Sequence, residues 1–278
     1  MSSLELRRRM MVQSEPADII IDARKGGVSG NAANDAALME VIYAQGWSKS
    51  PKYMTKREAE KVKFIHYGCF QSNLGITDFS AFKFFGVKGM DDIAFRNCTN
   101  LITIYFPPTL TKMEGGGGSG RFSYCSSLKN VNIEQLELMK NGNEFRNTAL
   151  ENVTLNENLP SVPTACFYNC NNLTSIIIPN SVKTISSSAF RRCKLLSTVV
   201  IGSGVESIGT KAFAKSTNQS KITVTIYAIT PPTIQSDTFT STFVNAIYVP
   251  DESVEAYKAA DVWSTFANKI KPISELPQ

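Results

Sequence analysis

Phenylalanine recurs at nearly constant intervals through most of the chain, and this period limits the possible folds more than any other feature. Successive members lie 27, 23, 22, 23 and 23 residues apart. They are Phe95, Phe122, Phe145, Phe167, Phe190 and Phe213. A unit this short buries too few side chains to close a core alone, so neighbouring units must cover each other's apolar faces. The period therefore predicts a solenoid of stacked coils.

Four of the units carry the same apolar template behind their phenylalanine. A small residue, a leucine and two aliphatic residues follow at fixed spacing, and in one copy the set is Phe190, Cys193, Leu196, Val199 and Ile201. The two aliphatic residues lie two positions apart, which is the period of a half-buried β-strand. A second apolar pair, Val205 and Ile208, is expected to close the opposite side of the coil. The predicted fold class is an α/β-type repeat solenoid with about 23 residues per coil and one short strand in each.

Two copies depart from this template. The run Gly115–Gly120 lengthens the first interval, and we expect a flexible loop that makes its coil bulge. The copy Phe145–Leu150 is one residue short. Upstream, Val87, Met90 and Phe95 have the same spacing as Val182, Ile185 and Phe190, which predicts that the repeats begin near Ile76–Phe79.

These repeats resemble the BspA-like leucine-rich repeats of bacteria, whose unit runs Ala-Phe-x-x-Cys-x-x-Leu-x-x-Ile-x-Ile-Pro-x-x-Val-x-x-Ile. The resemblance covers residues 76–249 and recurs in register across five copies. It implies a non-enzymatic binding or adhesion module that contacts a protein or glycan partner, as in host contact. It also implies the cell surface, although the chain start lacks the apolar stretch of a signal peptide, which leaves the cytoplasm or a phage particle as alternatives.

The segment before the repeats resembles the helix, EF-hand-like loop and second helix that precede many such arrays. Here Asp35–Gln45 reads as the first helix, with Asn34 as N-cap and Gly46 as its end. Thr55-Lys-Arg-Glu58 is a capping box for the second helix. The loop Trp47–Met54 contains two lysines and no carboxylate, so we predict a structural cap without calcium.

The C-terminal segment resembles the helical cap that follows such arrays. Asp251 is the expected N-cap, and Val254 and Tyr257 share one helix face that covers the last coil. The predicted organisation is a flexible basic segment (1–16), a helical N-terminal cap (17–75), the repeat solenoid (76–249) and a C-terminal helical cap (250–278). Two interpretations of the basic segment stay open, a docking element for a partner or membrane surface and a frayed terminus.

The cysteines and the single histidine do not form a recognisable catalytic or metal motif. Four cysteines occupy one repeat position, which Thr148 and Ser216 fill in other copies; they are Cys98, Cys125, Cys170 and Cys193. We expect free, buried thiols there, because a position that also accepts Thr or Ser does not specify disulfide pairs. Cys166 with Cys170 lacks a second ligand pair for zinc, and His66 with Cys69 lacks a third partner for nucleophilic catalysis.

Two surfaces are candidates for binding. The first is the column of outward strand positions, comprising Thr103, Tyr105, Asn130, Asn132, Asn152, Thr154, Ser175, Ile177, Thr198, Val200, Thr223 and Thr225. It is uncharged and rich in hydroxyls and amides, which suits a protein or glycan, although Thr, Val and Ile also simply favour strands. The second is a basic edge of Arg96, Arg146, Arg191, Arg192 and Lys194, with Lys215 nearby. It would suit an anionic glycan, a lipid headgroup or nucleic acid, or be solvated charge.

Composition narrows the function further. The chain of 278 residues has 29 Lys and Arg against 24 Asp and Glu, a mild basic excess. We see no interleaving of aromatic and basic residues along the sequence, so no specific nucleic-acid binding is predicted. No apolar run is long enough for a membrane span. No cofactor, metal or catalytic group is predicted; the alternatives to a binding module are a structural component of a phage particle or other assembly and, third, an enzyme.

Overall fold

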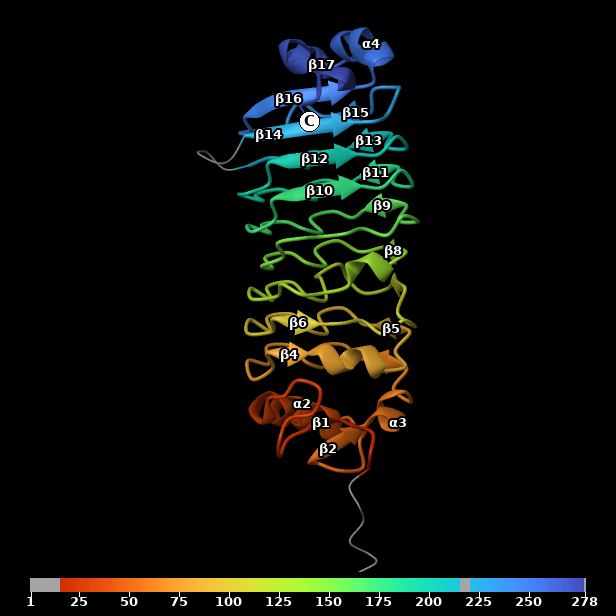
Figure 1. Cartoon of the computed structure of the whole chain (residues 1–278), viewed down its shortest axis with the longest axis vertical. Coiled ribbons are helices and arrows are strands. Elements are labelled where there is room, and N and C mark those ends of the chain that lie inside the picture. The colour runs from red at the N-terminus through yellow and green to blue at the C-terminus, as the bar shows by residue number, and fades with distance from the viewer. Residues whose placement is uncertain (1–15, 216–220, 278) are drawn as a thin grey trace, which may run out of the picture.

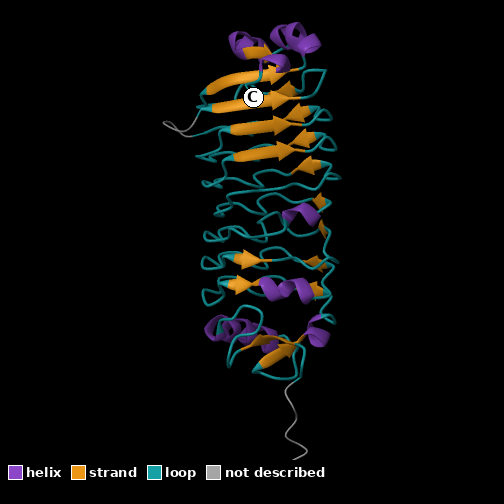
Figure 2. Cartoon of the chain, viewed as in Figure 1, coloured by secondary structure: helices purple, strands orange, loops and turns teal. Residues whose placement is uncertain are grey.

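The computed structural model describes residues 16–215 and 221–277, which form one elongated stack of coils (Figure 1). Helices lie at both ends of the stack and short strands along its sides (Figure 2). The repeat solenoid predicted from the phenylalanine period is confirmed. The basic segment 1–16 lies almost wholly outside the described residues, as does Ser216.

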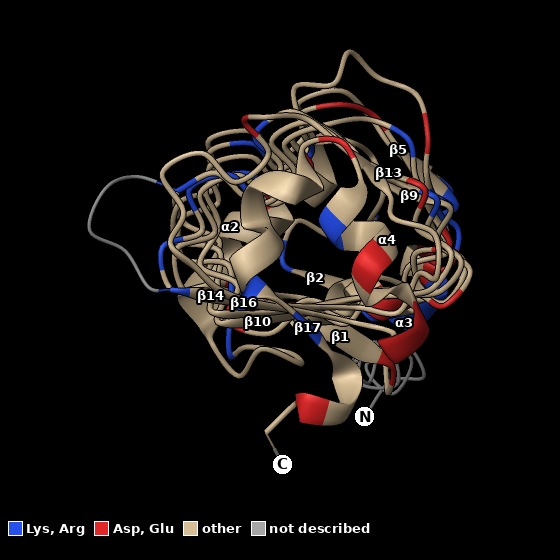
Figure 3. Cartoon of the chain, turned by 90° about the horizontal axis from the view of Figure 1, so that it is seen from above, with Lys and Arg blue, Asp and Glu red and all other residues tan. Residues whose placement is uncertain are grey.

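Two parallel sheets run along the stack on different sides (Figure 3). The larger sheet has the order β10-β12-β14-β16-β17, with bounds Ser175–Ile178, Thr198–Ile201, Ile222–Ile226, Val244–Val249 and Ile270–Pro272. The other has the order β15-β13-β11-β9, with bounds Thr233–Ile234, Ser207–Ile208, Thr184–Ile185 and Ser161–Val162. The second apolar pair of the template therefore also forms a strand, so these coils contribute two strands where one was expected.

Shorter pairs continue the pattern towards the N-terminus. They are β3 (Phe64–Ile65) with β5 (Gly89–Met90), β4 (Asp78–Phe79) with β6 (Thr103–Ile104), and β7 (Lys112–Met113) with β8 (Leu138–Met139). All three pairs are parallel. Because β3 already pairs with β5, coil-to-coil pairing starts upstream of the expected beginning at residue 76. Two 3-10 turns lie within these coils, η1 (Ser80–Phe84) and η2 (Ile133–Gln135).

A column of stacked phenylalanine rings forms the centre of the core. Neighbouring ring centroids are 4.7–5.7 Å apart and the ring planes deviate from parallel by 3–11°. The column contains the six periodic phenylalanines and continues with Phe70 at one end and Phe239 at the other. These two lie 25 and 26 residues from their neighbours, and the cysteine and leucine of the template are replaced behind them, by Asn73 and Ile76 after Phe70 and by Thr242 and Asn245 after Phe239.

The alternation within the strands is confirmed. Ile176 and Ile178 are almost fully buried, whereas the side chain of Ile177 between them is 63% exposed. The cysteine position of the template is buried as expected, and each of its four thiols donates to a phenylalanine carbonyl of the preceding coil, as Cys193 does to Phe167 O (3.1 Å). The position therefore selects a small side chain that can donate one hydrogen bond.

The N-terminal cap is built from a two-stranded antiparallel sheet and two helices. The sheet pairs β1 (Ile19–Asp22) with β2 (Tyr53–Thr55), and the first helix, α2, spans Ala32–Ala44. The predicted capping box is confirmed: Thr55 and Glu58 satisfy each other's backbone groups at the start of α3 (Lys56–Ala59). Trp47 packs against Phe70, the first ring of the phenylalanine column.

The predicted N-cap of α2 is wrong. Asn31 occupies that position, and its side chain accepts hydrogen bonds from Ala33 N and Asn34 N (both 3.1 Å). Asn34 is buried instead: its Oδ1 accepts from Thr77 N and Asp78 N (both 2.8 Å), and its Nδ2 donates to Asp78 O (2.8 Å). Either asparagine could cap a helix by its chemistry. The helix starts at the earlier one because the later one joins the cap to the first coil.

The C-terminal cap extends the sheet as well as covering it. After η3 (Asp251–Ser253) come α4 (Val254–Ala259), η4 (Trp263–Lys269), strand β17 and η5 (Ile273–Glu275), and β17 adds to β16 in parallel. Tyr257 and Trp263 are buried as the cap closes on the last coil. Asp251 is not the helix N-cap: its Oδ1 accepts from Ser274 N (3.1 Å).

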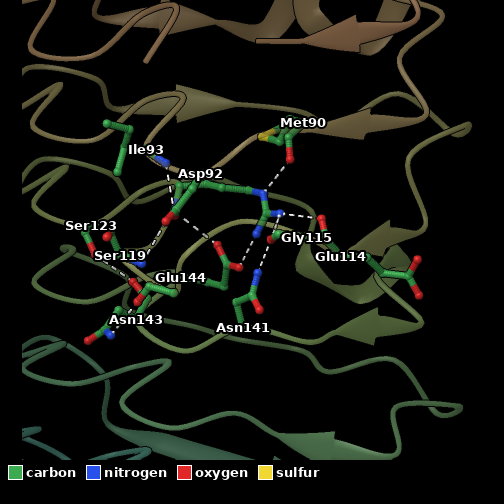
Figure 4. A network of polar contacts seen from close by, with 12 residues as sticks. Met90, Asp92, Ile93, Glu114, Gly115, Ser119, Ser123, Asn141, Asn143 and Glu144 are labelled. Carbon is green, nitrogen blue, oxygen red and sulfur yellow. Dashed lines mark hydrogen bonds and ion pairs between the residues drawn. The ribbon is translucent and has the colours of Figure 1, made fainter. Parts of the chain in front are cut away.

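The glycine-rich loop is anchored to the coil before it rather than projecting freely. Gly117 N and Ser119 N both donate to one carboxylate oxygen of the buried Asp92, at 2.9 and 3.0 Å (Figure 4). The loop is thus bonded to the coil before it, and its expected flexibility stays a prediction. The glycines let the backbone turn through left-handed conformations, as at Gly116 (φ +90°), where a Cβ would meet the Asp92 side chain at 2.7 Å.

Candidate binding surfaces

The structure places eleven of the twelve predicted strand-column residues at the surface. Six are exposed, namely Asn130, Asn152, Thr154, Ser175, Ile177 and Thr198. Five are half-buried, namely Thr103, Tyr105, Asn132, Val200 and Thr223. Thr225 is 5% exposed and is corrected to a buried position. Its partner in register on β16, Tyr248, is buried too, because the C-terminal turn η5 packs on β16.

The column is in register only in part. Ser175, Thr198 and Thr223 are paired residues on neighbouring strands, and Asn130 donates to the Thr103 hydroxyl (3.1 Å). Between these two groups, within the described residues, no backbone hydrogen bond joins the segment 151–155 to either neighbouring coil. Figure 2 shows loops in this part of the stack. This is the coil whose repeat is one residue short, and β10 is consequently an edge strand.

A shallow groove follows this open edge and continues onto the sheet. Its first part, lined by 152–155 and by residues of β10, has a volume of about 270 Å³. A second hollow shares Glu157, Ile177 and Pro179 with it and extends to Val200 and Tyr227. Ile177 and Tyr227 are the exposed apolar side chains here, at 63% and 47%. We call the two hollows together the strand-face groove.

The predicted column omitted Pro179 and Tyr227 although both line this groove. Each lies two residues beyond the last position of its strand that was predicted to face outward, and these positions are Ile177 and Thr225. Extending the period-two pattern by one step would have found them.

The predicted basic edge is interleaved with tyrosine. The guanidinium carbon of Arg96 lies 5.6 Å from the ring centroid of Tyr124, and that of Arg146 lies 5.8 Å from Tyr124 and 4.4 Å from Tyr168. The next coil contributes Arg191 and Arg192, whose guanidinium carbons lie 5.9 and 5.7 Å from the ring centroid of Tyr168. We call these six residues the Arg–Tyr ladder. Stacking of coils brings together aromatic and basic side chains that do not interleave in the sequence.

Two ladder residues occupy a costly backbone conformation. In three other coils the corresponding turn position is an asparagine with positive φ, as in Asn147 (+57°) and Asn169 (+60°). Tyr124 has φ +65° and Arg192 has φ +64° at this position. Asparagine tolerates left-handed conformations well, whereas larger side chains adopt them at a steric cost. The two side chains are thus held where their backbone disfavours them.

The lysines assigned to the basic edge behave differently. Lys194 is exposed. Lys215 is 7% exposed, its ammonium donates to Leu196 O, and burial lowers its pKa. Lys215 is therefore removed from the edge.

Charge along the ladder is not neutralised by acidic side chains. Among the described residues, none of the four ladder arginines has a carboxylate oxygen within 4.0 Å. Exposed lysines elsewhere do form such pairs, as Lys129 does with Glu151 and Lys183 with Glu206 (both 2.9 Å). The ladder is therefore a positively charged strip.

His66 and Cys69 show no catalytic arrangement. Burial raises the pKa of the Cys69 thiol to about 11, so the thiolate needed for nucleophilic attack is scarce near neutral pH. The ring of His66 is exposed and lies beside Phe64, with centroids 5.5 Å apart. Across the described part of the chain, all six cysteines are free and no three potential metal-binding side chains cluster. No described helix is long and apolar enough to cross a bilayer.

The repeats match a known family. The model of the BspA type leucine-rich repeat region matches residues 52–142 and 139–260, in six copies. These matches cover most of the chain, and the protein belongs to this family. The matched span begins upstream of Phe64, in agreement with the early start of coil pairing.

Similar solved structures are bacterial leucine-rich repeat proteins. A leucine-rich cell surface protein from Faecalibacterium prausnitzii is 21% identical, with 76% of this chain and 70% of that chain covered and a TM-score of 0.41. One from Bacteroides ovatus is 17% identical, with 73% and 61% covered and a TM-score of 0.42. The leucine-rich repeat protein of T. pallidum is 19% identical, with 75% and 76% covered and a TM-score of 0.37. A search of curated proteins finds no match.

Proposed function

We propose that the protein is a non-enzymatic binding module that holds an extended segment of a partner protein in the strand-face groove. The observation that carries this proposal is the groove along the open edge of β10, with Ile177 exposed at its centre. The predicted adhesion and host-contact roles would be uses of such a module. The alternatives of an assembly component and an enzyme stay predictions.

Unpaired backbone groups of β10 favour an extended polypeptide as the partner. Alternate residues of a parallel strand bond to opposite neighbours. Ile178 O accepts from Gly202 N (2.9 Å) of the next coil, so Ser175 and Ile177 direct their backbone groups towards the groove. A peptide that lies along this edge can bond to these groups and add a strand, as in recognition by β-augmentation.

The side chains of the groove favour an apolar partner segment. Ile177, Val200 and Tyr227 form its exposed apolar part, and Glu157 is its one charged lining residue in the two hollows. Alternate side chains of a bound strand would contact these residues, and burial of Ile177 contributes about 25 cal/mol for each Å² of apolar surface removed from water. Backbone bonds would supply affinity and these contacts specificity.

The test is a selection of linear phage-displayed peptides on the immobilised full-length protein. Selected peptides should bind Ile177→Asp at least about tenfold more weakly than wild type, a loss of about 1.4 kcal/mol. Leu195→Asp is the matched control, because Leu195 is an aliphatic residue of similar exposure (50%) outside the groove. Methylation of alternate peptide nitrogens should also abolish binding. Equal binding to both variants, or no enriched peptide, would overturn the proposal.

A further inference from the structure

We propose that the Arg–Tyr ladder is a binding site for a linear acidic polysaccharide in which charged and uncharged sugars alternate. The ladder shares no residue with the strand-face groove, so this inference does not depend on the function proposed above. Four features carry it: the spacing of its charges, the free donors of its guanidinium groups, the covered faces of its rings, and the strained backbone beneath two of its members.

The spacing of the arginines matches a disaccharide repeat. Arginine and tyrosine occupy alternate coils, from Arg96 through Tyr124, Arg146 and Tyr168 to Arg191. Positive charges therefore recur every second coil, about 10 Å apart, which is twice the spacing of neighbouring strands. In an extended glycan, one pyranose ring with its linking oxygen advances by about one coil. An acid on every second sugar would meet an arginine each time.

The guanidinium groups have donors available for carboxylates. Within the described residues, the guanidinium of Arg146 donates one hydrogen bond, to Asn143 Oδ1 (3.2 Å), and the side chains of Arg96, Arg191 and Arg192 make none. The Nε atoms of Arg96 and Arg146 are shielded from solvent and have no partner in the described structure. A buried donor without a partner is unfavourable, and a planar carboxylate fits the guanidinium fork. A bound acidic group would accept from the Nη donors of these arginines, whereas the shielded Nε atoms lie out of its reach.

The tyrosines hold the arginines in place. Tyr168 lies between Arg146 of the coil before it and Arg191 of the coil after it, and Tyr124 lies between Arg96 and Arg146. A cation over a ring face is attracted to it, so each guanidinium is positioned before a ligand arrives. Such preorganisation lowers the entropy that binding must remove.

The same sandwiching favours a glycan over single-stranded nucleic acid. Proteins bind unpaired nucleotides by stacking bases on open aromatic faces. Here arginines from two coils cover the faces of Tyr124 and Tyr168, which leaves ring edges and phenol hydroxyls for a ligand. Hydroxyl groups suit the polar edges of an uncharged sugar. The surface thus alternates a group for a carboxylate with a group for a sugar hydroxyl.

The backbone conformation of two ladder residues supports a binding role for the ladder. Tyr124 and Arg192 have positive φ where asparagine occurs in other coils. Replacement of either residue by asparagine would relieve strain, so their presence is not explained by stability. Backbone strain of this kind concentrates at functional sites.

The experiment uses the full-length protein and a fluorescent hyaluronan decasaccharide, in which glucuronate alternates with N-acetylglucosamine. Anisotropy titrations should show saturable binding that weakens with salt, because exposed charges are screened. An uncharged chitin oligosaccharide of similar length should not bind. No binding of the hyaluronan probe, or tighter binding of oligothymidylate than of hyaluronan, would overturn the proposal.

Variants locate the site. Arg146→Gln and the more peripheral Arg191→Gln should each weaken hyaluronan binding about tenfold, as expected for loss of a charged hydrogen bond. Lys183→Gln is the matched control, because it removes an exposed charge outside the ladder and should leave binding unchanged. Ile177→Asp should also bind hyaluronan as wild type does, which separates this site from the strand-face groove. Unchanged binding in both arginine variants, with thermal unfolding like that of wild type, would contradict the assignment.

Discussion

The guanidinium of Arg121 forms an ion pair with the carboxylate of Glu144 in the adjacent coil, and neither side chain is exposed to solvent. Three further donors of Arg121 are used: its Nε bonds to Met90 O (2.9 Å), and its Nη2 bonds to Glu114 O (2.7 Å) and Gly115 O (2.9 Å) (Figure 4). One buried cation therefore joins three successive coils and holds the start of the glycine loop. Removal of one partner of such a pair leaves an uncompensated buried charge.

This pair should make stability depend on pH. Burial raises the pKa of the Glu144 carboxyl from about 4.5 to about 7, against the opposing charge of Arg121. Because the folded state binds this proton more tightly than the unfolded chain does, its contribution is complete below about pH 4.5 and is lost as pH rises through about 7. Urea unfolding across this window should show a decline in the free energy of unfolding that is absent in Glu144→Gln.

The control for this measurement is Glu151→Gln, which removes an exposed carboxylate paired with Lys129. It should keep the decline seen in wild type, since exposed ion pairs contribute little. A Glu144→Gln profile that follows wild type throughout would show that this carboxyl does not titrate in the window.

The strand phase can be tested by a pair of alanine substitutions. Ile176 is buried in β10, and Ile176→Ala should lower the free energy of unfolding by about 2–5 kcal/mol through lost burial and a residual cavity. Thr198 is exposed on the next strand, and Thr198→Ala should cost less than about 0.5 kcal/mol. Chemical denaturation measures both. Small and equal losses would disprove the assigned inward and outward positions.

Asn34 should contribute more to stability than its position within a helix suggests. Its side chain bonds to three backbone groups of Thr77 and Asp78, so Asn34→Ala leaves buried donors and acceptors unpaired and should cost about 1–3 kcal/mol. Asn31→Ala, which removes the actual helix cap, should cost about 1 kcal/mol. Hydrogen exchange should show faster opening of α2 and the first coil in Asn34→Ala. If the first coil is protected from hydrogen exchange equally in Asn34→Ala and Asn31→Ala, the bonds of Asn34 to Thr77 and Asp78 do not stabilise that coil.

The cysteines should differ in reactivity by position. Cys69 is half-buried, whereas the other five are buried. Alkylation of the native protein followed by mass spectrometry should modify Cys69 first, and slowly, because burial raises its pKa to about 11. The other five should react only after unfolding. Modification of Cys193 in the folded protein, at a rate similar to that of Cys69, would contradict its place in the core.

Much of the architecture was predictable because it rests on local periodicity. Phe190 and the four apolar residues that follow it are buried at the predicted positions, since alternation along a strand decides which side faces the core. Phe70 and Phe239 were missed because the residues that follow them depart from the template, although their rings continue the same column. Asn31 and Asn34 could not be told apart, because both satisfy the chemistry of an N-cap.

The candidate binding surfaces, like the fold, were predictable from the sequence only in part. The sequence by itself determined that the chain forms stacked coils and which residues of each coil face outward, because a short repeated unit must bury one face and expose the other. Only the tertiary structure decided that arginines and tyrosines from alternate coils interleave, that Lys215 turns inward, and that the sheet is interrupted beside β10. These features depend on contacts between residues more than twenty positions apart, and no local pattern specifies how side chains from successive coils meet.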